Sequence, residues 1–396
     1  MSNINENMMK LGKVRSVIRE TFEYGNARAA QIGSDNVFDF SLGNPSVPAP
    51  SCFDEALINL IENYDSVSLH GYTSAQGDAN TRSAIAENIN KRFNANVDKN
   101  DIYITCGAAA SLTISINALA YKGDEIIVFA PFFPEYRVFV ENSGAKMVVV
   151  PADIDNFQID FKAFEALVNK NTKAVIINSP NNPTGVVYSK NTIERLCNIL
   201  KNKSNEYASP IYLISDEPYR ELVFDDIELP YITNCYDNSI VCYSFSKSLS
   251  LPGERIGYIV VGNRMQFKND VYAAICGSGR ALGYVCAPSM MQKAIVNCLG
   301  TTSDINVYKT NRDLLYNALS DYGYNCVKPD GAFYLFAKAP ISDANEFCLK
   351  AREYELLLVP SDSFGCSGYV RISYCVSTDM IKRALPAFKK LIDNYR

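Results

Sequence analysis

The sequence contains a single histidine, His70, among its 396 residues. One histidine excludes a metal site with two histidine ligands and every metalloprotease motif that pairs histidines. A Ser-His-Asp triad would have to use His70 itself. We therefore expect any chemistry to be carried by lysine, aspartate, tyrosine, arginine or a cofactor.

The sequence also lacks a dominant charge and a long apolar run. Lys and Arg total 38 and Asp and Glu total 43, so the net charge is −5. Without a basic excess, neither nucleic acid nor an anionic membrane is an expected partner. No run approaches the roughly 18 apolar residues of a transmembrane helix. A hydrophobic content of 47% predicts a folded chain with a sizeable core, and its length suggests two domains.

Twelve cysteines are scattered along the chain, and none of them forms a C-x-x-C pair. The first ten residues are polar and no apolar segment follows them, so we expect no secretory signal. Free thiols in a reducing compartment are then a better interpretation than six disulfides. The expected location is cytoplasmic.

Short apolar runs alternate with helix-length segments through the first two thirds of the chain. The runs are about four or five residues long, mostly β-branched or aromatic, and are bounded by Gly, Pro, Asn or Asp, which is typical of strands buried on both faces. The alternation predicts an α/β fold: a three-layer large domain with a mostly parallel seven-stranded sheet. The predicted strands are 102–105, 126–130, 147–151, 174–178, 211–215, 240–244 and 258–261. The helices between several of them are 109–120, 133–143, 160–170 and 190–203.

The pattern changes after about residue 285 and predicts a smaller α+β domain. We place the large domain at 50–285, and the small domain at 1–49 and 286–396 with an N-terminal arm. Its predicted elements are an amphipathic helix at 13–32, helices at 288–299, 304–321 and 344–353, and apolar runs at 331–337 and 369–374.

Chemically informative residues follow four of the predicted strands, where open parallel sheets bind their ligands. Small residues from Gly107 to Ser111 let backbone N–H groups approach an anion, although a tight turn also explains them. Two prolines and two asparagines form the turn at 179–185. Asp216 either caps a helix or faces a cationic ligand atom. A lysine directly after a buried strand, Lys247, is a candidate amine nucleophile for carbonyls, and the alternative is a lysine in a solvent-facing loop.

The segment 244–257 resembles the cofactor-attachment segment of class I/II pyridoxal-phosphate-dependent aminotransferases, which are fold type I enzymes related to aspartate aminotransferase. It matches as Ser, aromatic, Ser, Lys, then Arg eight residues later, followed by an aliphatic residue and Gly. Further segments fall in the order of that family over nearly the whole chain. They are Leu42-Gly43-Asn44-Pro45, Tyr72 with Gly77, Gly107-Ala108, the aromatic cluster Pro131–Tyr136, Asn182-Pro183-Thr184-Gly185, Asp216-x-x-Tyr219, Lys247, Arg255 and Arg371-Ile372-Ser373.

The resemblance implies pyridoxal 5'-phosphate as cofactor and assigns roles around its ring. Lys247 is expected to form the Schiff base with the cofactor aldehyde and to carry the substrate Cα proton. Asp216 is expected to keep the pyridine nitrogen protonated. Tyr219 and Asn182 would bind the ring 3-oxygen, and Phe133 would stack on the ring.

The resemblance also assigns the cofactor phosphate and the subunit arrangement. Tyr72 is expected to reach the phosphate of a neighbouring subunit, which implies a homodimer with shared sites. The phosphate ligands within one chain would be the backbone N–H groups or side chains of Ala108, Ala109, Ser244, Ser246 and Arg255.

The substrate residues follow from the same resemblance. Arg371 would bind the α-carboxylate through its two-pronged guanidinium, with Asn182 and the Gly43 backbone nearby. Arg280 lies about one long helix after Lys247, where one aspartate aminotransferase subgroup places an arginine that binds the side-chain carboxylate across the dimer. A cation near a helix C-terminus with no part in substrate binding explains Arg280 equally well.

The expected function is transfer of an amino group between an L-amino acid, with aspartate as the best guess, and a 2-oxo acid. Alanine, glutamate and aromatic donors stay open. The alternative on the same fold is a C–S β-lyase that acts on cystathionine or cysteine conjugates, which would release pyruvate, ammonia and a thiol. A regulatory module fused to a DNA-binding domain is disfavoured because only some 40 residues precede Gly43.

Overall fold

The computed structural model describes residues 4–13 and 16–396, and the chain forms two compact units. The larger unit comprises Val47–Ile305 and Pro329–Ala332. The smaller unit comprises Met1–Ser46, Asn306–Lys328 and Phe333–Arg396. The predicted boundary near residue 285 differs from this division, because residues 286–305 belong with the larger unit, where α13 (Ser289–Ala294) and η3 (Ile295–Cys298) pack on α3 (Ser51–Asn63).

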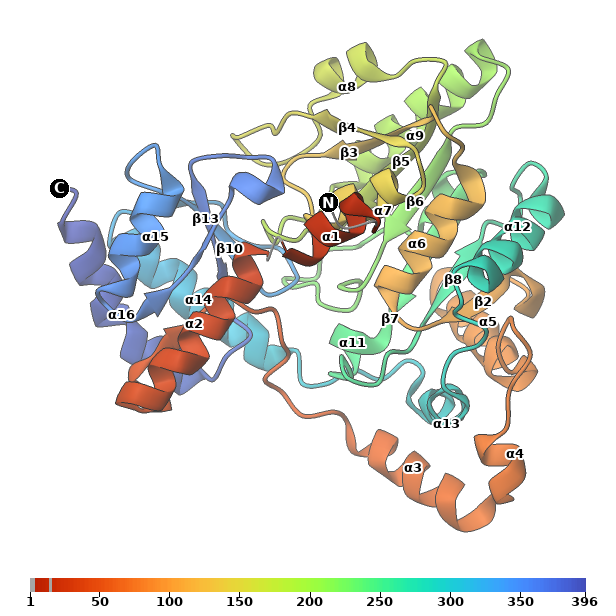
Figure 1. Ribbon diagram of the computed structural model, residues 1–396, viewed down its shortest axis with the longest axis horizontal. Helices are drawn as coiled ribbons and strands as arrows, with labels where there is room; N and C mark the ends of the chain where they lie inside the picture. Colours follow the sequence, from red (N-terminus) through yellow and green to blue (C-terminus); the bar gives the residue numbers. More distant parts are fainter. Residues whose placement is uncertain (1–3, 14–15) are drawn as a thin grey trace. The chain divides into compact units, whose positions relative to one another are not determined.

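A seven-stranded sheet forms the centre of the larger unit (Figure 1), as the sequence predicts. Its strand order is β2-β8-β7-β6-β5-β3-β4, and all neighbours are parallel except that β8 runs antiparallel to both β2 and β7. Each of the seven predicted runs overlaps one strand of this sheet. The strands are β2 (Ile102–Thr105), β3 (Glu125–Phe129), β4 (Lys146–Val150), β5 (Thr172–Asn178), β6 (Tyr212–Asp216), β7 (Ser239–Ser244) and β8 (Gly257–Val261).

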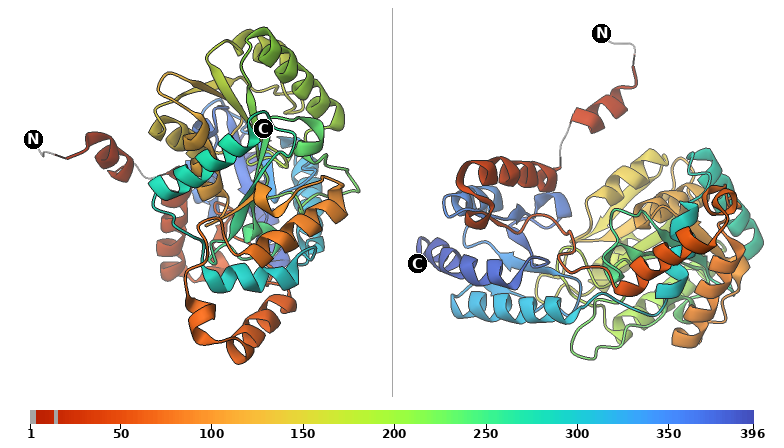
Figure 2. Two further views of the ribbon diagram at one scale, coloured as in Figure 1. Left: turned by 90° about the vertical axis from the view of Figure 1, so that its right-hand side faces the viewer. Right: turned by 90° about the horizontal axis from the view of Figure 1, so that it is seen from below.

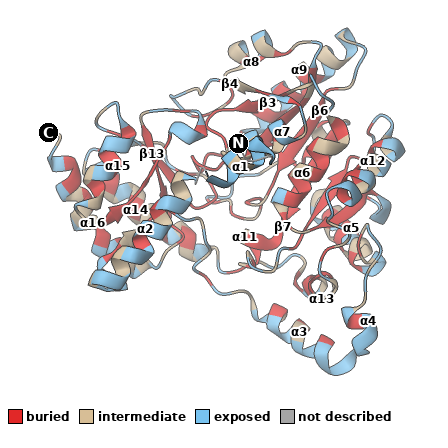
Figure 3. Ribbon diagram, viewed as in Figure 1, coloured by how far each residue is buried: buried red, intermediate tan, exposed pale blue. Residues whose placement is uncertain are grey.

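Helices cover both faces of this sheet, which makes three layers (Figures 1 and 2). Along β3, Ile126 and Val128 pack with α6, α7 and α12, whereas Ile127 and Phe129 pack with α8 and α9. This alternation explains why β3 is apolar from Ile126 to Phe129, and the strands of this sheet are largely buried in Figure 3. The helices are α4 (Ser66–His70), α5 (Ala79–Phe93), α6 (Ala108–Leu119), α7 (Glu135–Asn142), α8 (Phe161–Leu167), α9 (Lys190–Glu206), α10 (Ile232–Cys235), α11 (Phe245–Ser248) and α12 (Lys268–Ala281), with the short η2 (Lys99–Asp101).

The smaller unit contains a four-stranded antiparallel sheet in the order β12-β13-β10-β9 and a parallel pair, β1 with β11. The predicted helix at 13–32 corresponds to α2, which begins at Val17 after the capping side chain of Ser16. Positions 14–15 lie outside the described residues, and Lys13 ends α1. The strands are β1 (Phe38–Asp39), β9 (Asn325–Cys326), β10 (Tyr334–Lys338), β11 (Leu356–Leu357), β12 (Val359–Pro360) and β13 (Tyr369–Ser373). The helices are α1 (Glu6–Lys13), α2 (Val17–Ile32), α14 (Asn306–Asp321), α15 (Ala344–Arg352) and α16 (Thr378–Asp393), with η1 (Ser34–Asn36) and η4 (Asp362–Phe364).

Strand pairing brings together the carboxyl ends of β2, β5, β6 and β7, which carry or precede the predicted site residues. Across β5, β6 and β7, Asn178 pairs with Asp216 and Asp216 pairs with Cys242. Across β7, β8 and β2, Ser244 and Thr105 both pair with Gly257. The segments that follow β2, β5, β6 and β7 therefore emerge at one edge of the sheet.

The remaining predictions from composition concern thiols and membranes. All twelve cysteines are free thiols, as predicted, although the Sγ atoms of Cys52 and Cys298 lie 2.8 Å apart. In the described part of the chain, no helix is both long enough and apolar enough to cross a bilayer.

Candidate active site

Asp216 is a buried carboxylate at the end of β6 with one oxygen engaged and one available. The Tyr136 hydroxyl donates a hydrogen bond of 2.5 Å to Asp216 Oδ2. No described residue donates to Oδ1, although that atom is shielded from solvent. A buried oxygen without a donor is costly unless a ligand group supplies one. Asp216 therefore fits a cationic or N–H-bearing group that binds at this edge of the sheet.

The protonation of Asp216 depends strongly on what binds there. Burial raises the pKa of Asp216 to about 7, the Tyr136 hydrogen bond opposes that rise, and the nearby Glu217 charge adds to it. Burial, followed by the Asp216 charge, holds the pKa of Tyr136 well above its usual range, so Tyr136 stays a donor. A ligand cation facing Oδ1 would lower the pKa of Asp216 and keep it ionised.

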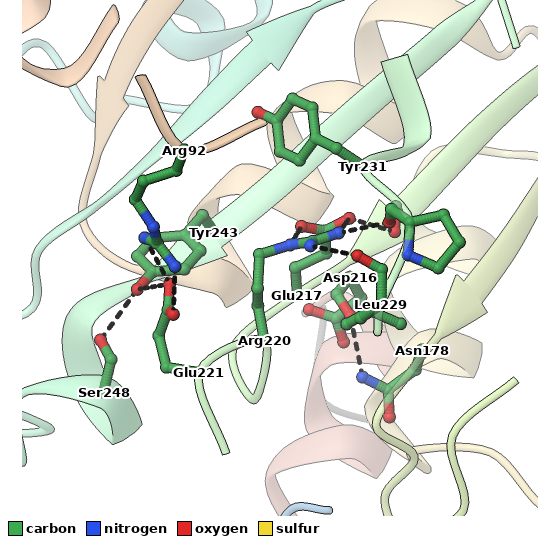
Figure 4. Close-up of polar contacts among 12 residues, drawn as sticks. Arg92, Asn178, Asp216, Glu217, Arg220, Glu221, Leu229, Tyr231, Tyr243 and Ser248 are labelled. Atoms are coloured by element: carbon green, nitrogen blue, oxygen red, sulfur yellow. Dashed lines mark hydrogen bonds and ion pairs between the residues drawn. The ribbon is translucent and has the colours of Figure 1, made fainter. Parts of the chain in front are cut away.

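Lys247 lies on α11, the short helix that follows β7. Ser244 caps this helix by accepting a hydrogen bond from the Ser246 backbone N–H, and the two serine hydroxyls lie 2.7 Å apart. Directly after Lys247 in the chain, Ser248 Oγ accepts a hydrogen bond of 2.9 Å from the Tyr243 hydroxyl (Figure 4). Lys247 itself is half-buried. The cap on one side and Tyr243 on the other hold the backbone of the lysine in place.

Arg255 and the start of α6 form a second polar cluster at this edge. Gly107 precedes α6 with a φ of +90° and provides no capping side chain, so the first N–H groups of the helix, at Ala108 and Ala109, are not capped by it. A Cβ at Gly107 would lie 3.0 Å from the Arg255 guanidinium. Arg255 has a φ of +52°, and its guanidinium donates to the carbonyls of Pro252 and Cys106. An exposed guanidinium beside uncapped helix N–H groups is suited to an anion.

The asparagine turn after β5 lies against Asp216. Asn178 Nδ2 donates to the backbone carbonyl of Asp216 at 2.9 Å (Figure 4), and Asn178 Oδ1 accepts from the Asn182 backbone N–H at 2.7 Å. Asn182 and Tyr219 are both buried. Phe133 is half-buried, with its ring edge-on to that of Tyr136 at 5.7 Å between centroids. The larger unit thus gathers the predicted ring and phosphate residues, except Tyr72, at one edge.

Arg371 belongs to the smaller unit, in β13, and is 2% exposed. Its guanidinium lies over the rings of Tyr334 and Phe364, at 4.6 and 5.3 Å from their centroids, and donates to the Ser41 carbonyl at 2.5 Å. A side chain at Gly43 would collide with the Tyr334 hydroxyl, so only glycine fits there. The structure therefore places Arg371 and the Gly43 segment together within this unit.

Three residues singled out in the sequence lie outside both groups. Tyr72 is 93% exposed and follows the short helix α4. His70 ends that helix and is also exposed. Arg280 is exposed in the last turn of α12, two residues after Ser278, whose hydroxyl bonds to the Ile114 carbonyl in the middle of α6.

Sequence reasoning missed the direct partners of Asp216. Tyr136 appears there only as the end of an aromatic cluster, and Asn178 only as the last residue of a strand. In the sequence, each is only a polar group next to apolar residues, and that position does not show which residue its side chain contacts. The ion pair between Glu217 and Arg220 was also missed, and it is buried beside Asp216.

The chain is similar to known proteins over nearly its whole length. Residues 35–388 match the family model described as aminotransferase class I and II. The chain is 30% identical over 386 residues to a probable aspartate aminotransferase of Methanocaldococcus jannaschii, which covers 96% of this chain and 97% of that protein. An aspartate aminotransferase of Thermotoga maritima is 29% identical over 384 residues, covering 95% and 97%.

Two crystal structures extend the likeness to the fold. An aminotransferase from Eubacterium rectale superposes with a TM-score of 0.98 at 57% identity and covers all of both chains. The Thermotoga maritima aspartate aminotransferase superposes with a TM-score of 0.87 at 28% identity, covering 98% of this chain and all of the other. The chain therefore belongs to the class I and II aminotransferase family and is a pyridoxal-phosphate-dependent transaminase.

Proposed function

We propose that this transaminase uses L-aspartate as its amino donor and a 2-oxo acid as its acceptor, through the residues gathered at the sheet edge. The observation that carries the proposal is the buried Asp216, with an oxygen lacking a donor, at the same edge as Lys247 and Arg255. Support for aspartate comes from relatives that are named aspartate aminotransferase.

The described residues fit pyridoxal phosphate at both ends. Asp216 Oδ1 suits the protonated ring nitrogen, and Arg255 with the start of α6 and Ser244 suits the phosphate. We assign Tyr219 and Asn182 to the ring oxygen, Phe133 to the ring face, and Ser246 and the N–H groups of Ala108 and Ala109 to the phosphate. When bound, the protonated ring supplies an electron sink for the bond that breaks at the amino-acid Cα.

The chain itself supplies proton transfer and orientation. Lys247 would hold the cofactor in the resting enzyme, and its Nζ would be the base that takes the proton from the amino-acid Cα. Asp216 stays ionised against the cationic ring, because the facing charge lowers its pKa from the raised value of the free site. Arg371 would bind the α-carboxylate of the amino acid through its guanidinium.

The test of this function is the absorbance of the purified protein before and after L-aspartate is added without any oxo acid. We expect the yellow absorption of the bound cofactor to fall, and one equivalent of oxaloacetate to appear per site. Pyruvate, ammonia and a thiol from cystathionine, with no response to aspartate, would instead identify the β-lyase. A colourless protein that takes up no pyridoxal phosphate would contradict the proposed function as a whole.

The two substrate arginines are expected to differ in what they recognise. Arg371→Ala should lower kcat/KM by about 10²-fold or more for every donor, because all donors carry an α-carboxylate. Arg280→Ala should lower kcat/KM for aspartate and leave alanine unchanged, if it binds the side-chain carboxylate. Steady-state kinetics with both donors measure this difference. Arg383→Ala, which removes an exposed ion pair with Asp379 in the smaller unit, is the control. Unchanged aspartate kinetics in Arg280→Ala would mean that Arg280 is only a cation near the helix C-terminus and has no part in substrate binding.

We further propose a homodimer in which Tyr72 contacts the partner's cofactor phosphate. Large apolar side chains are exposed along α3 and at the start of α4, the helix that precedes Tyr72, and exposed apolar side chains of this kind are typical of a subunit interface. They are Ile58, Ile61, Tyr64 and Val67. Light scattering of the purified protein measures the subunit number, and a monomeric active enzyme would contradict the arrangement.

A further inference from the structure

A buried ion pair joins Glu217 and Arg220, which directly follow Asp216 and Tyr219 in the chain. The guanidinium of Arg220 engages both carboxylate oxygens of Glu217, with Nη2 to Oε1 at 3.0 Å (Figure 4). The two side chains are 5% and 1% exposed. The Ser215 hydroxyl also donates to Glu217 Oε1 at 2.8 Å.

Two backbone carbonyls and two aromatic rings also contact the guanidinium of Arg220. It donates to the carbonyls of Leu229 and Pro230 at 3.3 and 2.9 Å. Its guanidinium carbon lies 5.1 and 5.0 Å from the ring centroids of Phe93 and Tyr231. Burial lowers the pKa of Arg220 while the Glu217 charge raises it, and the net shift is upward, so the arginine stays charged.

Stability alone is a weak reason for such a pair. Transfer of two charges out of water costs much of the free energy that their attraction gains. Replacement of both partners by apolar residues is therefore often neutral or stabilising. Removal of one partner alone is strongly destabilising, because the other charge stays buried. The position of the pair in the chain therefore calls for another explanation.

The pair closes the turn 217–220, which contains Tyr219 and directly follows Asp216, the two residues that are proposed to bind the cofactor ring. Glu217 follows Asp216 directly, and Arg220 follows Tyr219 directly. The Glu217 N–H donates to the Cys242 carbonyl of β7 at 2.8 Å, and the Leu222 N–H donates to the Tyr219 carbonyl at 2.8 Å. With its two ends tied by the ion pair, the turn has little freedom to shift Asp216 relative to Tyr219.

We propose that the Glu217–Arg220 pair positions Asp216 and Tyr219 against the cofactor ring, and so sets the rate of the chemical step. Glu217 and Arg220 are positioning residues, because they act through their neighbours. This inference rests on the proposed function, since it concerns the same site. A misplacement of about 1 Å in reacting groups is enough to cost up to roughly 10²-fold in rate.

The test separates positioning from stability with a double variant. Glu217→Gln and Arg220→Met each leave one buried charge unpaired, so both should lower the urea midpoint and lower kcat. The double variant E217Q/R220M removes both charges of the pair together, and we expect its methionine to pack against the Phe93 and Tyr231 rings that contact Arg220. We expect the double variant to regain much of the urea midpoint that the single variants lose, although the Leu229 and Pro230 carbonyls lose a donor, and to keep a kcat roughly tenfold or more below wild type.

Two further readouts apply to the same proteins. The KM for aspartate should change less than about threefold, because Arg371 in the smaller unit holds the carboxylate. The dissociation constant of pyridoxal phosphate should rise in all three variants, because Asp216 and Tyr219 are proposed to bind its ring.

Lys268→Gln is the matched control in the same unit. Lys268 pairs at 2.8 Å with Asp101, a buried carboxylate that precedes β2, whereas Gly107 follows β2 at its other end. This control should lose stability and keep kcat and cofactor affinity.

A double variant that regains wild-type kcat together with its stability would overturn the positioning role. A kcat that falls with stability in every variant, Lys268→Gln included, would also overturn it. If single variants fail to fold, the double variant alone carries the test. A wild-type protein without transamination would contradict the proposed function instead, so the two failures are distinguishable.

Discussion

Replacement of Lys247 by alanine is expected to lower kcat by at least about 10³-fold, while pyridoxal phosphate still binds. The loss is large because one amine serves both as nucleophile and as proton carrier. Production of oxaloacetate from aspartate measures the rate. Borohydride reduction followed by intact-mass measurement gives a readout that does not depend on turnover. The wild-type chain should gain the mass of one phosphopyridoxyl group, because the Schiff base forms with loss of water and is then reduced, and the variant should not.

The control for Lys247→Ala is Lys268→Gln, which removes a lysine of the same unit that pairs with Asp101. That variant should acquire the cofactor mass on reduction like the wild type. Covalent attachment that persists in Lys247→Ala would show that another lysine holds the cofactor, and would contradict the assignment of this residue.

Asp216→Asn is expected to have opposite effects on activity and on the stability of the cofactor-free protein. The amide cannot supply the negative charge that keeps the ring nitrogen protonated, so kcat should fall by about 10²-fold or more. The dissociation constant of pyridoxal phosphate should rise in the same variant. Steady-state kinetics and a cofactor titration measure these two losses.

The stability effect follows from the pKa of Asp216, which is about 7 in the folded protein against an ordinary value of 3.8. Between these values the folded chain holds a proton that the unfolded chain has released. Stability therefore falls as the pH rises from about 4 to 7, by up to about 4 kcal/mol. Asparagine has no charge to bury, although one amide N–H stays unpaired, at a cost of about 1–3 kcal/mol.

We therefore expect cofactor-free Asp216→Asn to be about 1–3 kcal/mol more stable than wild type at pH 8. This advantage should be lost at pH 4, which is close to the ordinary pKa of 3.8, because Asp216 is then protonated in the folded state and its ionisation in the unfolded state lowers stability only slightly. Urea unfolding at the two pH values measures the difference. Equal stability at pH 8 would mean that Asp216 is solvated or already paired in the free protein.

Much of the fold could be predicted because a buried strand can be recognised from the apolar pattern of its own residues. The run Ile126–Ala130 is apolar throughout because both faces of β3 are covered, as the packing of Ile126 and Ile127 on opposite faces shows. A parallel sheet brings the ends of its strands to one edge, so reading the residue after each strand located Asp216 and Lys247. The family resemblance then supplied their roles.

Other features cannot be recognised from any single segment of the sequence, because they depend on which strands pair and in which direction. The run at 258–261 reads like its neighbours, yet β8 is antiparallel to β2 and β7. That reversal brings Gly257, and with it Arg255, beside Gly107 and Ser244.

The environment of Asp216 is likewise a tertiary property. The sequence by itself determined which side chains stand at the strand ends, since local hydrophobic patterning encodes strand burial. Only the tertiary structure decided that Tyr136, 80 residues earlier, donates to Asp216, and that Glu217 and Arg220 are buried together. Tyr136 and Asp216 meet because of strand order and helix packing. Water screens buried charges less than exposed ones, so the interactions of the buried charges are stronger than they would be at the surface.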